Sequence, residues 1–359
     1  MCPVPLQSLR RLARGLVIAL GVASTAPALA YSVVRPALGY RKGWIELLDD
    51  FAPWLYLAAP FALIVGQLVG SRAAMAAGGA ASAMFVRRWG GRFVRWDGCH
   101  TRDATSTTAG ALTLMTFNVL AWTRDGDDIA AAIARIDPDV VTLQEIGPRP
   151  MARLLIALGD RLPYSAVHAT PSSAGTATLS RFPLSDAEPF TLSALGGHWC
   201  ARMTVHAPTG PIALFNIHTK IPRLRMSRRH LGRYWLPAAF HAERRLVEVH
   251  KLCAMIDAIE GPLLLMGDFN MTERSEDYAL IARRLTDAYR EVGRGLGQTF
   301  PAWRSVPQSL PLPFPMLRLD HIWYSRHFAA VWAKVGPSAG SDHHSVVVRV
   351  ATRTRNTDP

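Results

Sequence analysis

The sequence predicts an α/β domain preceded by an N-terminal membrane region. From about residue 111 to 351, short apolar segments of strand length alternate with segments of helical periodicity, a pattern typical of a layered α/β fold. Before residue 95, two charge-free stretches are each long enough to cross a bilayer. A chain of 359 residues has room for one large domain and such an extension.

The membrane region comprises residues 1–95. Residues 15–34 and 51–70 carry no charge over 20 residues each, and residues 73–86 form a shorter apolar segment of 14 residues. A hydrocarbon core about 30 Å thick requires about 20 apolar residues, so the first two segments are predicted to span it. The third segment is a crossing, a re-entrant piece or an interfacial helix. A buried helical hairpin of a soluble protein is the alternative to all of these.

The side of the membrane depends on how the first stretch is interpreted. Arginines, an apolar run and Ala-Pro-Ala-Leu-Ala before Tyr31 also resemble a cleaved signal peptide. A cleaved signal with two crossings, or three retained crossings, places the C-terminal domain outside a bacterial inner or plasma membrane. The arginines that follow the third segment favour the opposite side. We expect the extracytoplasmic side, from the number of apolar segments.

The remaining elements follow in chain order. Residues 96–110 are polar and are predicted to be a linker, and the domain spans residues 111–351. Strands are expected at residues 111–117, 140–143, 212–217, 263–266, 322–324 and 346–350. Helices are expected at residues 129–136, 151–158 and 243–259. The proline-dense residues 307–315 indicate an extended surface loop.

Polar side chains lie at six of these strand ends. They are Asn118, Gln144-Glu145, His218, Asp268 with Asn270, Asp320-His321, and Asp342-His343. Any one of them alone is an ordinary cap or turn residue. In a layered α/β fold, however, ligands bind where strands end and loops meet. Their recurrence at six ends therefore predicts a functional site.

The chemistry of this set is coherent. Carboxylate and amide oxygens are ligands suited to Mg²⁺ or Mn²⁺, and histidines beside carboxylates can donate protons to phosphoryl oxygens. The formal net charge of +13 favours an anionic partner. The four cysteines show neither a CxxC motif nor a metal-binding spacing. The residues therefore predict metal-dependent hydrolysis of a phosphate ester.

The chain also resembles the endonuclease/exonuclease/phosphatase superfamily, which includes deoxyribonuclease-type nucleases and neutral sphingomyelinases. The resemblance covers about residues 111–351 and follows the order of the family motifs. The matching motifs are Thr116-Phe117-Asn118-Val119, Leu143-Gln144-Glu145, the segment 175–184, Asn216-Ile217-His218, Gly267-Asp268-Phe269-Asn270, Arg318-Leu319-Asp320-His321-Ile322 and Ser341-Asp342-His343. The resemblance implies a four-layer α/β/β/α sandwich with the site at one edge.

The resemblance also implies a metal site that holds Mg²⁺ or Mn²⁺. Glu145 is the expected main ligand, with Asn118 beside it. Asp342 is expected to bind the metal or a water molecule. The number of ions is left open.

Five further residues receive catalytic roles from the resemblance. Asp268 is expected to orient or deprotonate the attacking water, and Asn270 to bind the phosphate or position Asp268. His343 is expected to contact the scissile phosphate, polarised by Asp320. His218 is expected to stabilise charge on the phosphoryl oxygens.

The spacing of Asp268 and Asn270 adds a geometric expectation. The two residues flank Phe269, and alternate side chains of an extended chain lie on the same side. Both polar side chains are therefore expected to point into one site while Phe269 packs the other way.

The substrate is predicted only by class. A basic loop follows His218 and contains Lys220, Arg223, Arg225, Arg228, Arg229 and Arg233. Of these, Lys220, Arg223 and Arg225 are the candidate substrate-binding residues. The loop suits a nucleic-acid backbone or phospholipid headgroups, with residues 234–236 entering the membrane interface. A solvated helical face is the structural alternative.

Three functions therefore remain open. The leading one is a membrane-anchored, metal-dependent phosphodiesterase or phosphatase. The others are a DNA endonuclease or exonuclease and a non-catalytic, membrane-bound binding module that retains the fold. No protein partner is predicted.

Overall fold

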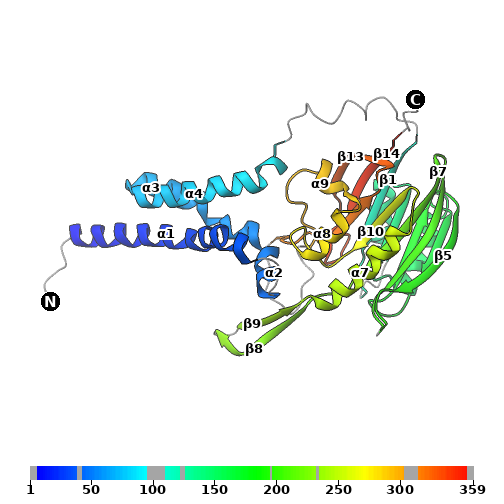
Figure 1. Cartoon of the computed structure of the whole chain (residues 1–359), viewed down its shortest axis with the longest axis horizontal. Coiled ribbons are helices and arrows are strands. Elements are labelled where there is room, and N and C mark those ends of the chain that lie inside the picture. Colours follow the sequence, from blue (N-terminus) through cyan, green and yellow to red (C-terminus); the bar gives the residue numbers. More distant parts are fainter. Residues whose placement is uncertain are drawn as a thin grey trace. The chain divides into compact units, whose positions relative to one another are not determined.

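The structure, a computed structural model, describes residues 6–38, 43–94, 110–121, 126–194, 196–231, 234–302 and 314–353. The predicted linker 96–110, except Gly110, and most of the proline-dense segment 307–315 lie outside the described residues. The chain divides into two compact units, residues 1–95 and 96–359 (Figure 1).

The N-terminal unit is helical. Its elements are α1 (Leu6–Leu38), α2 (Gly43–Asp50), η1 (Ala52–Tyr56), α3 (Ala58–Val69), α4 (Arg72–Trp89) and η2 (Gly90–Arg92). Within the described residues, two helical segments are long and apolar enough to cross a membrane, Gln7–Leu38 and Ala52–Val69. The short third apolar segment, residues 73–86, lies in α4, which is not among the helical segments that meet this criterion.

Glycines allow α3 and α4 to pack closely. A Cβ atom at Gly66 would lie 2.6 Å from the backbone nitrogen of Met75, and one at Gly78 would lie 2.4 Å from that of Leu63. Both contacts are too short for any side chain, so the two helix backbones approach each other at positions where only glycine fits.

The C-terminal unit contains two six-stranded sheets. The first has the strand order β13 (Phe328–Val335), β14 (Val346–Thr352), β1 (Ala111–Asn118), β2 (Val140–Gln144), β4 (Thr176–Ser180) and β3 (Tyr164–His168). The second has the order β11 (Thr286–Asp287), β12 (Asp320–Tyr324), β10 (Leu263–Asp268), β7 (Gly210–His218), β6 (Trp199–Ala207) and β5 (Leu184–Thr191).

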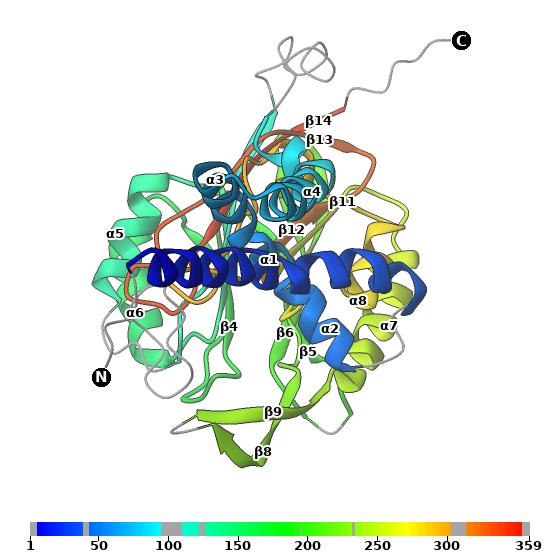
Figure 2. The ribbon, with the colours of Figure 1, turned by 90° about the vertical axis from the view of Figure 1, so that its left-hand side faces the viewer.

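Helices cover the outer faces of the two sheets. The helices of this unit are α5 (Asp127–Ile136), α6 (Pro148–Leu158), α7 (Glu243–Asp257), α8 (Glu276–Ala282) and α9 (Ala288–Val292). Figure 2 shows α5 and α6 outside the first sheet and α7 and α8 outside the second. This confirms the predicted α/β/β/α sandwich.

The near-continuous apolar strands are explained by burial on both faces. In β1, Leu114 belongs to the core between the sheets, whereas Met115 and Phe117 pack in the core beneath α5 and α6. In β10, Leu264 faces the core between the sheets and Leu265 the core beneath α7. Side chains alternate between two cores, so neither face of these strands requires polar residues.

From Arg223 on, the basic segment after His218 is neither a loop nor a helical face, so that expectation was wrong there. It forms the hairpin of β8 (Arg223–Leu231) and β9 (Tyr234–His241), in which Arg223 pairs with His241 and Leu231 with Tyr234. This hairpin extends away from the two large sheets (Figures 1 and 2). Residues 234–236 were expected at a membrane interface. Their side chains are not among those that the structure describes.

Strand register brings the polar strand ends to one edge. In the first sheet, β1 and β2 are parallel, and Asn118 pairs with Gln144. In the second, β10 is parallel to β7 and antiparallel to β12, so that Asp268 pairs with both His218 and Asp320. The ends of five strands from both sheets therefore meet at the same edge.

Candidate active site

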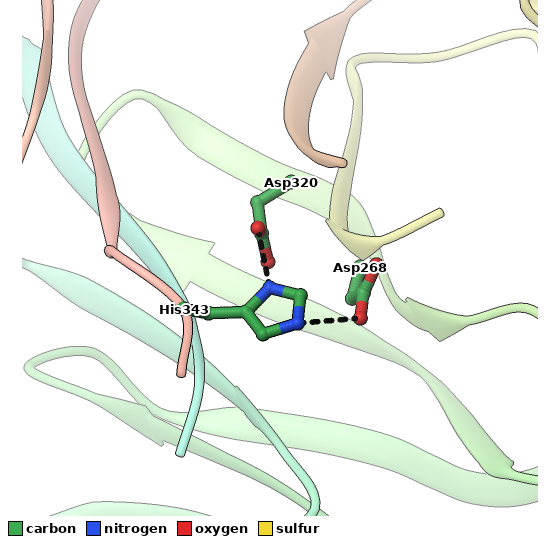
Figure 3. Close-up of side chains that lie close together, drawn as sticks. All are labelled: Asp268, Asp320 and His343. Carbon is green, nitrogen blue, oxygen red and sulfur yellow. Dashed lines mark hydrogen bonds and ion pairs between the residues drawn. The ribbon is translucent and has the colours of Figure 1, made fainter. Parts of the chain in front are cut away.

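A histidine between two aspartates forms the centre of the site (Figure 3). The Nδ1 atom of His343 donates to Oδ2 of Asp320 at 2.8 Å. Its Nε2 atom lies 3.8 Å from Oδ2 of Asp268. All three side chains are buried, and the loop before β14, the start of β12 and the end of β10 supply them. The imidazole thus joins two carboxylates from neighbouring elements.

Asn118 connects this centre to Glu145. Its Nδ2 atom donates to Oδ2 of Asp268 at 3.0 Å and to Oε1 of Glu145 at 3.2 Å. Its own oxygen accepts from the backbone nitrogen of Leu120 at 3.1 Å. In this orientation, the Asn118 amide holds two carboxylates and its oxygen is turned away from them.

His218 lies against the same carboxylates. Its Nε2 atom is 3.6 Å from Oδ2 of Asp268 and 3.9 Å from Oε1 of Glu145. Within the described part of the chain, neither of its ring nitrogens has a hydrogen-bond partner. A buried imidazole with unengaged nitrogens is prepared to bind a ligand atom.

Asn270 has a different geometry from the one expected. It adopts a left-handed backbone conformation with φ 47°, so the chain is not extended there. Its backbone nitrogen donates to Oδ1 of Asp268 at 2.9 Å, and its Nδ2 donates to the carbonyl of Thr219 at 2.9 Å. Phe269 does pack in the core on the far side. Asn270 therefore holds Asp268 from its backbone and the neighbouring loop from its side chain.

A buried polar bridge joins the two sheets beneath the site. Gln144 donates through Nε2 to Oδ1 of Asn216 at 2.7 Å, and Asn216 donates through Nδ2 to the carbonyl of Ala177 at 2.8 Å. Each hydrogen bond crosses from one sheet to the other. The bridge fixes the spacing of the sheets directly below Glu145 and His218.

Two buried arginines support the loops around the site. Arg318 lies two residues before Asp320 in the chain. It donates to both carboxylate oxygens of Asp287, at 3.1 and 2.7 Å. Arg245 donates to Asp277 and to the carbonyl of Asn270. Each arginine is buried together with its carboxylate partner, and so each charge is compensated.

Burial and neighbouring charges give the site residues opposite protonation states. Burial, with Asp320 nearby, raises the pKa of Asp268 to about 7, against the opposing effect of His343. Burial alone would lower the pKa of His343, but Asp320 and Asp268 outweigh it and raise this pKa to about 10. Burial and then His198 hold the pKa of His218 well below its usual value. At neutral pH, His343 is charged and His218 is neutral.

The acidic groups of the site fit a divalent cation. Glu145, Asp268, Asp320 and Asp342 gather there, and within the described residues no lysine or arginine forms an ion pair with any of them. Burial raises the pKa of Asp342, and Glu145 raises it further. Ligand atoms of Asp268, Asp320 and His343 also lie within 4.8 Å of one another. Hard carboxylate oxygens gathered in this way suit Mg²⁺ or Mn²⁺.

The predicted substrate-binding residues lie outside this centre. The Nζ atom of Lys220 is 2.9 Å from Oγ of Ser193 and 3.9 Å from Oε1 of buried Glu248, so its charge is already partly compensated. Arg223 and Arg225 are exposed on β8. The structure thus gathers the eight other predicted residues but not these three.

Sequence reasoning missed several residues of the site. They are Asn216, Thr219, Arg245, Asp287 and His198, which stacks on His218. Asn216 belongs to the recognised motif Asn216-Ile217-His218 but received no role, and its position in an apolar strand was the available signal. The others form their contacts with residues far apart in the sequence, and no local pattern indicates them.

This fold and this site define a class of α/β sandwich proteins with an acidic, histidine-containing centre. Residues 115–343 match the model of the Endonuclease/Exonuclease/phosphatase family. Because this match covers well over half of the chain, the chain belongs to this family. The activities in the family name all act on phosphate esters. No curated protein matches the chain.

Solved structures share the fold. An endonuclease/exonuclease/phosphatase from Beutenbergia cavernae is 23% identical with a TM-score of 0.52, covering 68% of this chain and 72% of that chain. A functionally unknown protein from Enterococcus faecalis is 17% identical with a TM-score of 0.53, covering 67% and 100%. D. rerio TDP2, complexed with a single-strand DNA product, is 15% identical with a TM-score of 0.53, covering 68% and 100%.

Proposed function

We propose that this protein is a divalent-metal-dependent hydrolase of phosphate esters that is attached to a membrane. The observation that carries the proposal is the arrangement of Asp268, His343 and Asp320 beside Glu145. It combines a carboxylate of raised pKa, a charged imidazole and the further carboxylate of Glu145 in one centre. A binding module of the same fold would not require this combination.

Each side chain of the site has its own role in the proposed hydrolysis. Asp268 accepts the proton of the attacking water, since a pKa of about 7 suits a general base at neutral pH. His343, held by Asp320, donates from Nε2 to a phosphoryl oxygen. The neutral imidazole of His218 offers a further hydrogen bond to the phosphate. Asn118 and Asn270 keep Asp268 in place through the bonds described above.

Glu145 and Asp342 would hold the metal ion, with Asn118 beside them. For Asn118 to offer its oxygen, its amide must turn from the orientation seen here. When bound, Mg²⁺ or Mn²⁺ would neutralise phosphate charge and polarise the ester.

Membrane attachment is supported by the N-terminal unit. Large apolar side chains are exposed on α1 and α3, among them Leu12, Leu16, Leu20, Phe61 and Leu68. Exposed apolar surface of this extent is unfavourable in water and suits lipid. The close glycine contacts of α3 with α4 are also typical of helix pairs in membranes. A signal sequence would explain α1 alone but not this helix pair.

The basic hairpin supports an anionic substrate. Arg223 and Arg225 are exposed on β8, and β8 begins five residues after His218. Exposed arginines next to a membrane attract anionic headgroups. We therefore favour a phospholipid headgroup as the source of the phosphate ester. DNA is the second candidate, because the same charges suit a nucleic-acid backbone.

The test uses the full-length protein in detergent and bis(p-nitrophenyl) phosphate as substrate. We expect hydrolysis that requires Mg²⁺ or Mn²⁺ and is lost in Asp268→Ala and His343→Ala. Anionic phospholipid vesicles and plasmid DNA, assayed in parallel, then identify the preferred substrate.

Matched controls are Asp160→Ala and His206→Ala, which replace the same residue types at exposed positions. Both should retain wild-type turnover. Equal turnover in wild type and in the two site variants would refute the assigned chemistry.

A further inference from the structure

The two buried histidines of the site are held in different ways. A hydrogen bond to Asp320 at 2.8 Å fixes the ring of His343. His218, by contrast, has no hydrogen-bond partner on either ring nitrogen in the part of the chain that the structure describes. A ring without such a bond requires another contact to hold its orientation.

A second imidazole supplies this contact. The rings of His198 and His218 are stacked, with centroids 3.6 Å apart and planes inclined by 24°. His198 lies in the segment before β6, outside the motifs of the family. Stacked aromatic rings attract each other and restrict rotation of the covered ring.

His198 is itself fixed to the loop that carries the site. Its Nδ1 atom donates to the carbonyl of Thr219 at 3.3 Å, and this residue directly follows His218. The backbone nitrogen of Thr219 donates to the carbonyl of Asp268 at 3.0 Å, and its hydroxyl donates to the carbonyl of Phe269. The stacked ring is thus anchored to the same strand ends as the residues it accompanies.

We propose that His198 is the positioning residue of His218 and does through stacking what Asp320 does for His343 through a hydrogen bond. A hydrogen-bonded partner would occupy one ring nitrogen of His218. A stacked partner leaves both nitrogens available, with Nε2 facing Asp268 and Glu145 at 3.6 and 3.9 Å. This inference rests on the proposed phosphoester hydrolysis and assigns one more residue to it.

The kinetic test compares His198→Ala, His198→Leu and His198→Phe in the full-length protein. We expect Ala and Leu to lower kcat about 100-fold, the effect of displacing a catalytic group by about 1 Å, with KM unchanged. Phe retains a flat ring but cannot donate to the carbonyl of Thr219, so it should restore most of the wild-type kcat through stacking alone. Leu fills the space without a planar ring, so it separates stacking from packing if the Ala variant does not fold.

The structural test uses NMR signals of the His218 ring in protein labelled at histidine. The stacked ring should shift these signals in the wild type and in His198→Phe, and the shift should disappear in His198→Leu. His206→Ala, at the other end of β6, serves as the control and should change neither the signals nor kcat.

Several results would overturn the inference. One is a wild-type kcat in His198→Leu, and another is a kcat of His198→Phe as low as that of His198→Leu. A third is that the NMR signals of the His218 ring stay the same when the ring of residue 198 is removed. Failure of the proposed function looks different, since Asp268→Ala and His343→Ala would then be as active as wild type. The NMR comparison decides the positioning role in that case as well.

Discussion

The Nδ1 atom of His343 lies 2.8 Å from Oδ2 of Asp320, and both residues are buried. The Oδ1 atom of Asp320 has no partner within the described residues, so the bond to His343 is the main contact seen for this carboxylate. The pair thus sets both the direction of the imidazole and its charge.

Replacing Asp320 by Asn keeps the volume of the side chain but removes its charge. We expect kcat to fall by about 10² to 10⁴, because His343 loses its orienting and charge-stabilising partner. Steady-state hydrolysis of bis(p-nitrophenyl) phosphate measures this. Asp160→Asn makes the same change at an exposed position and should leave kcat unchanged. An Asp320→Asn enzyme of wild-type activity would remove Asp320 from the mechanism.

Metal affinity should depend on Glu145. Chelation with EDTA is expected to abolish turnover, and added Mg²⁺ or Mn²⁺ to restore it. Glu145→Gln loses a charged ligand and should weaken Mg²⁺ binding by at least about 10- to 100-fold, measured by calorimetry on the metal-free protein. Glu260→Gln is the exposed control. Unchanged Mg²⁺ affinity in Glu145→Gln would place the ion elsewhere.

The buried Arg318–Asp287 pair predicts a pH-dependent stability. Burial alone would raise the pKa of Asp287, but Arg318 outweighs it and holds this pKa far below its ordinary value. The carboxylate therefore stabilises the fold above its unfolded pKa of about 3.9, and this contribution is lost as the pH falls toward the folded value.

Asp287→Asn should therefore lower the free energy of unfolding by up to about 3–5 kcal/mol at neutral pH, because buried Arg318 loses its nearest carboxylate and keeps Glu273, at 3.4 Å, as a more distant partner. The difference in the free energy of unfolding between this variant and the wild type should stay constant down to about pH 5 and become smaller below about pH 4. Denaturant titrations at several pH values measure it. The exposed ion pair of Arg202 and Glu188 is the control. Glu188→Gln should lower the free energy of unfolding by at most about 1 kcal/mol. A difference that grows as the pH falls would contradict the assignment.

Gly267 allows β10 to lie against β7 just before Asp268. Its φ is +151°, and a Cβ atom there would lie 1.9 Å from the carbonyl oxygen of Ile217. Gly267→Ala must push the two strands apart, so we expect a loss of stability above about 3 kcal/mol and loss of activity. Gly261→Ala, where a Cβ meets nothing within 4 Å, is the matched control. Thermal unfolding followed by tryptophan fluorescence distinguishes the two, and equal melting temperatures would refute the prediction.

The exposed arginines of β8 should govern the encounter with a large anionic substrate. Arg223→Ala with Arg225→Ala is expected to weaken binding to phosphatidylglycerol vesicles by about 1 kcal/mol per arginine, and less at high salt. Hydrolysis of bis(p-nitrophenyl) phosphate should be unchanged. The control removes equal charge at Arg135 and Arg326, which are exposed elsewhere. Equal vesicle binding by both double variants would exclude the hairpin as a docking surface.

Much of the fold is readable in the sequence because its strands are buried on both faces. The apolar segments at residues 111–117, 140–143 and 263–266 could be assigned without any partner, since each strand contacts a core on either side. The hairpin of β8 and β9 is not predicted, because the alternation of Arg223-Leu224-Arg225-Met226 stops at Ser227-Arg228-Arg229 and Pro237 interrupts the second strand.

The sequence alone determined the α/β class, the two apolar N-terminal stretches and the eight polar residues at strand ends. These are properties of local composition and of chain direction, because parallel strands bring like ends to the same edge. Tertiary structure alone decided that His198 covers His218, that Asn216 bridges the sheets and that Lys220 turns to Glu248. Such contacts join residues far apart in the chain, and their distances follow from the packing of whole layers, which no local pattern encodes.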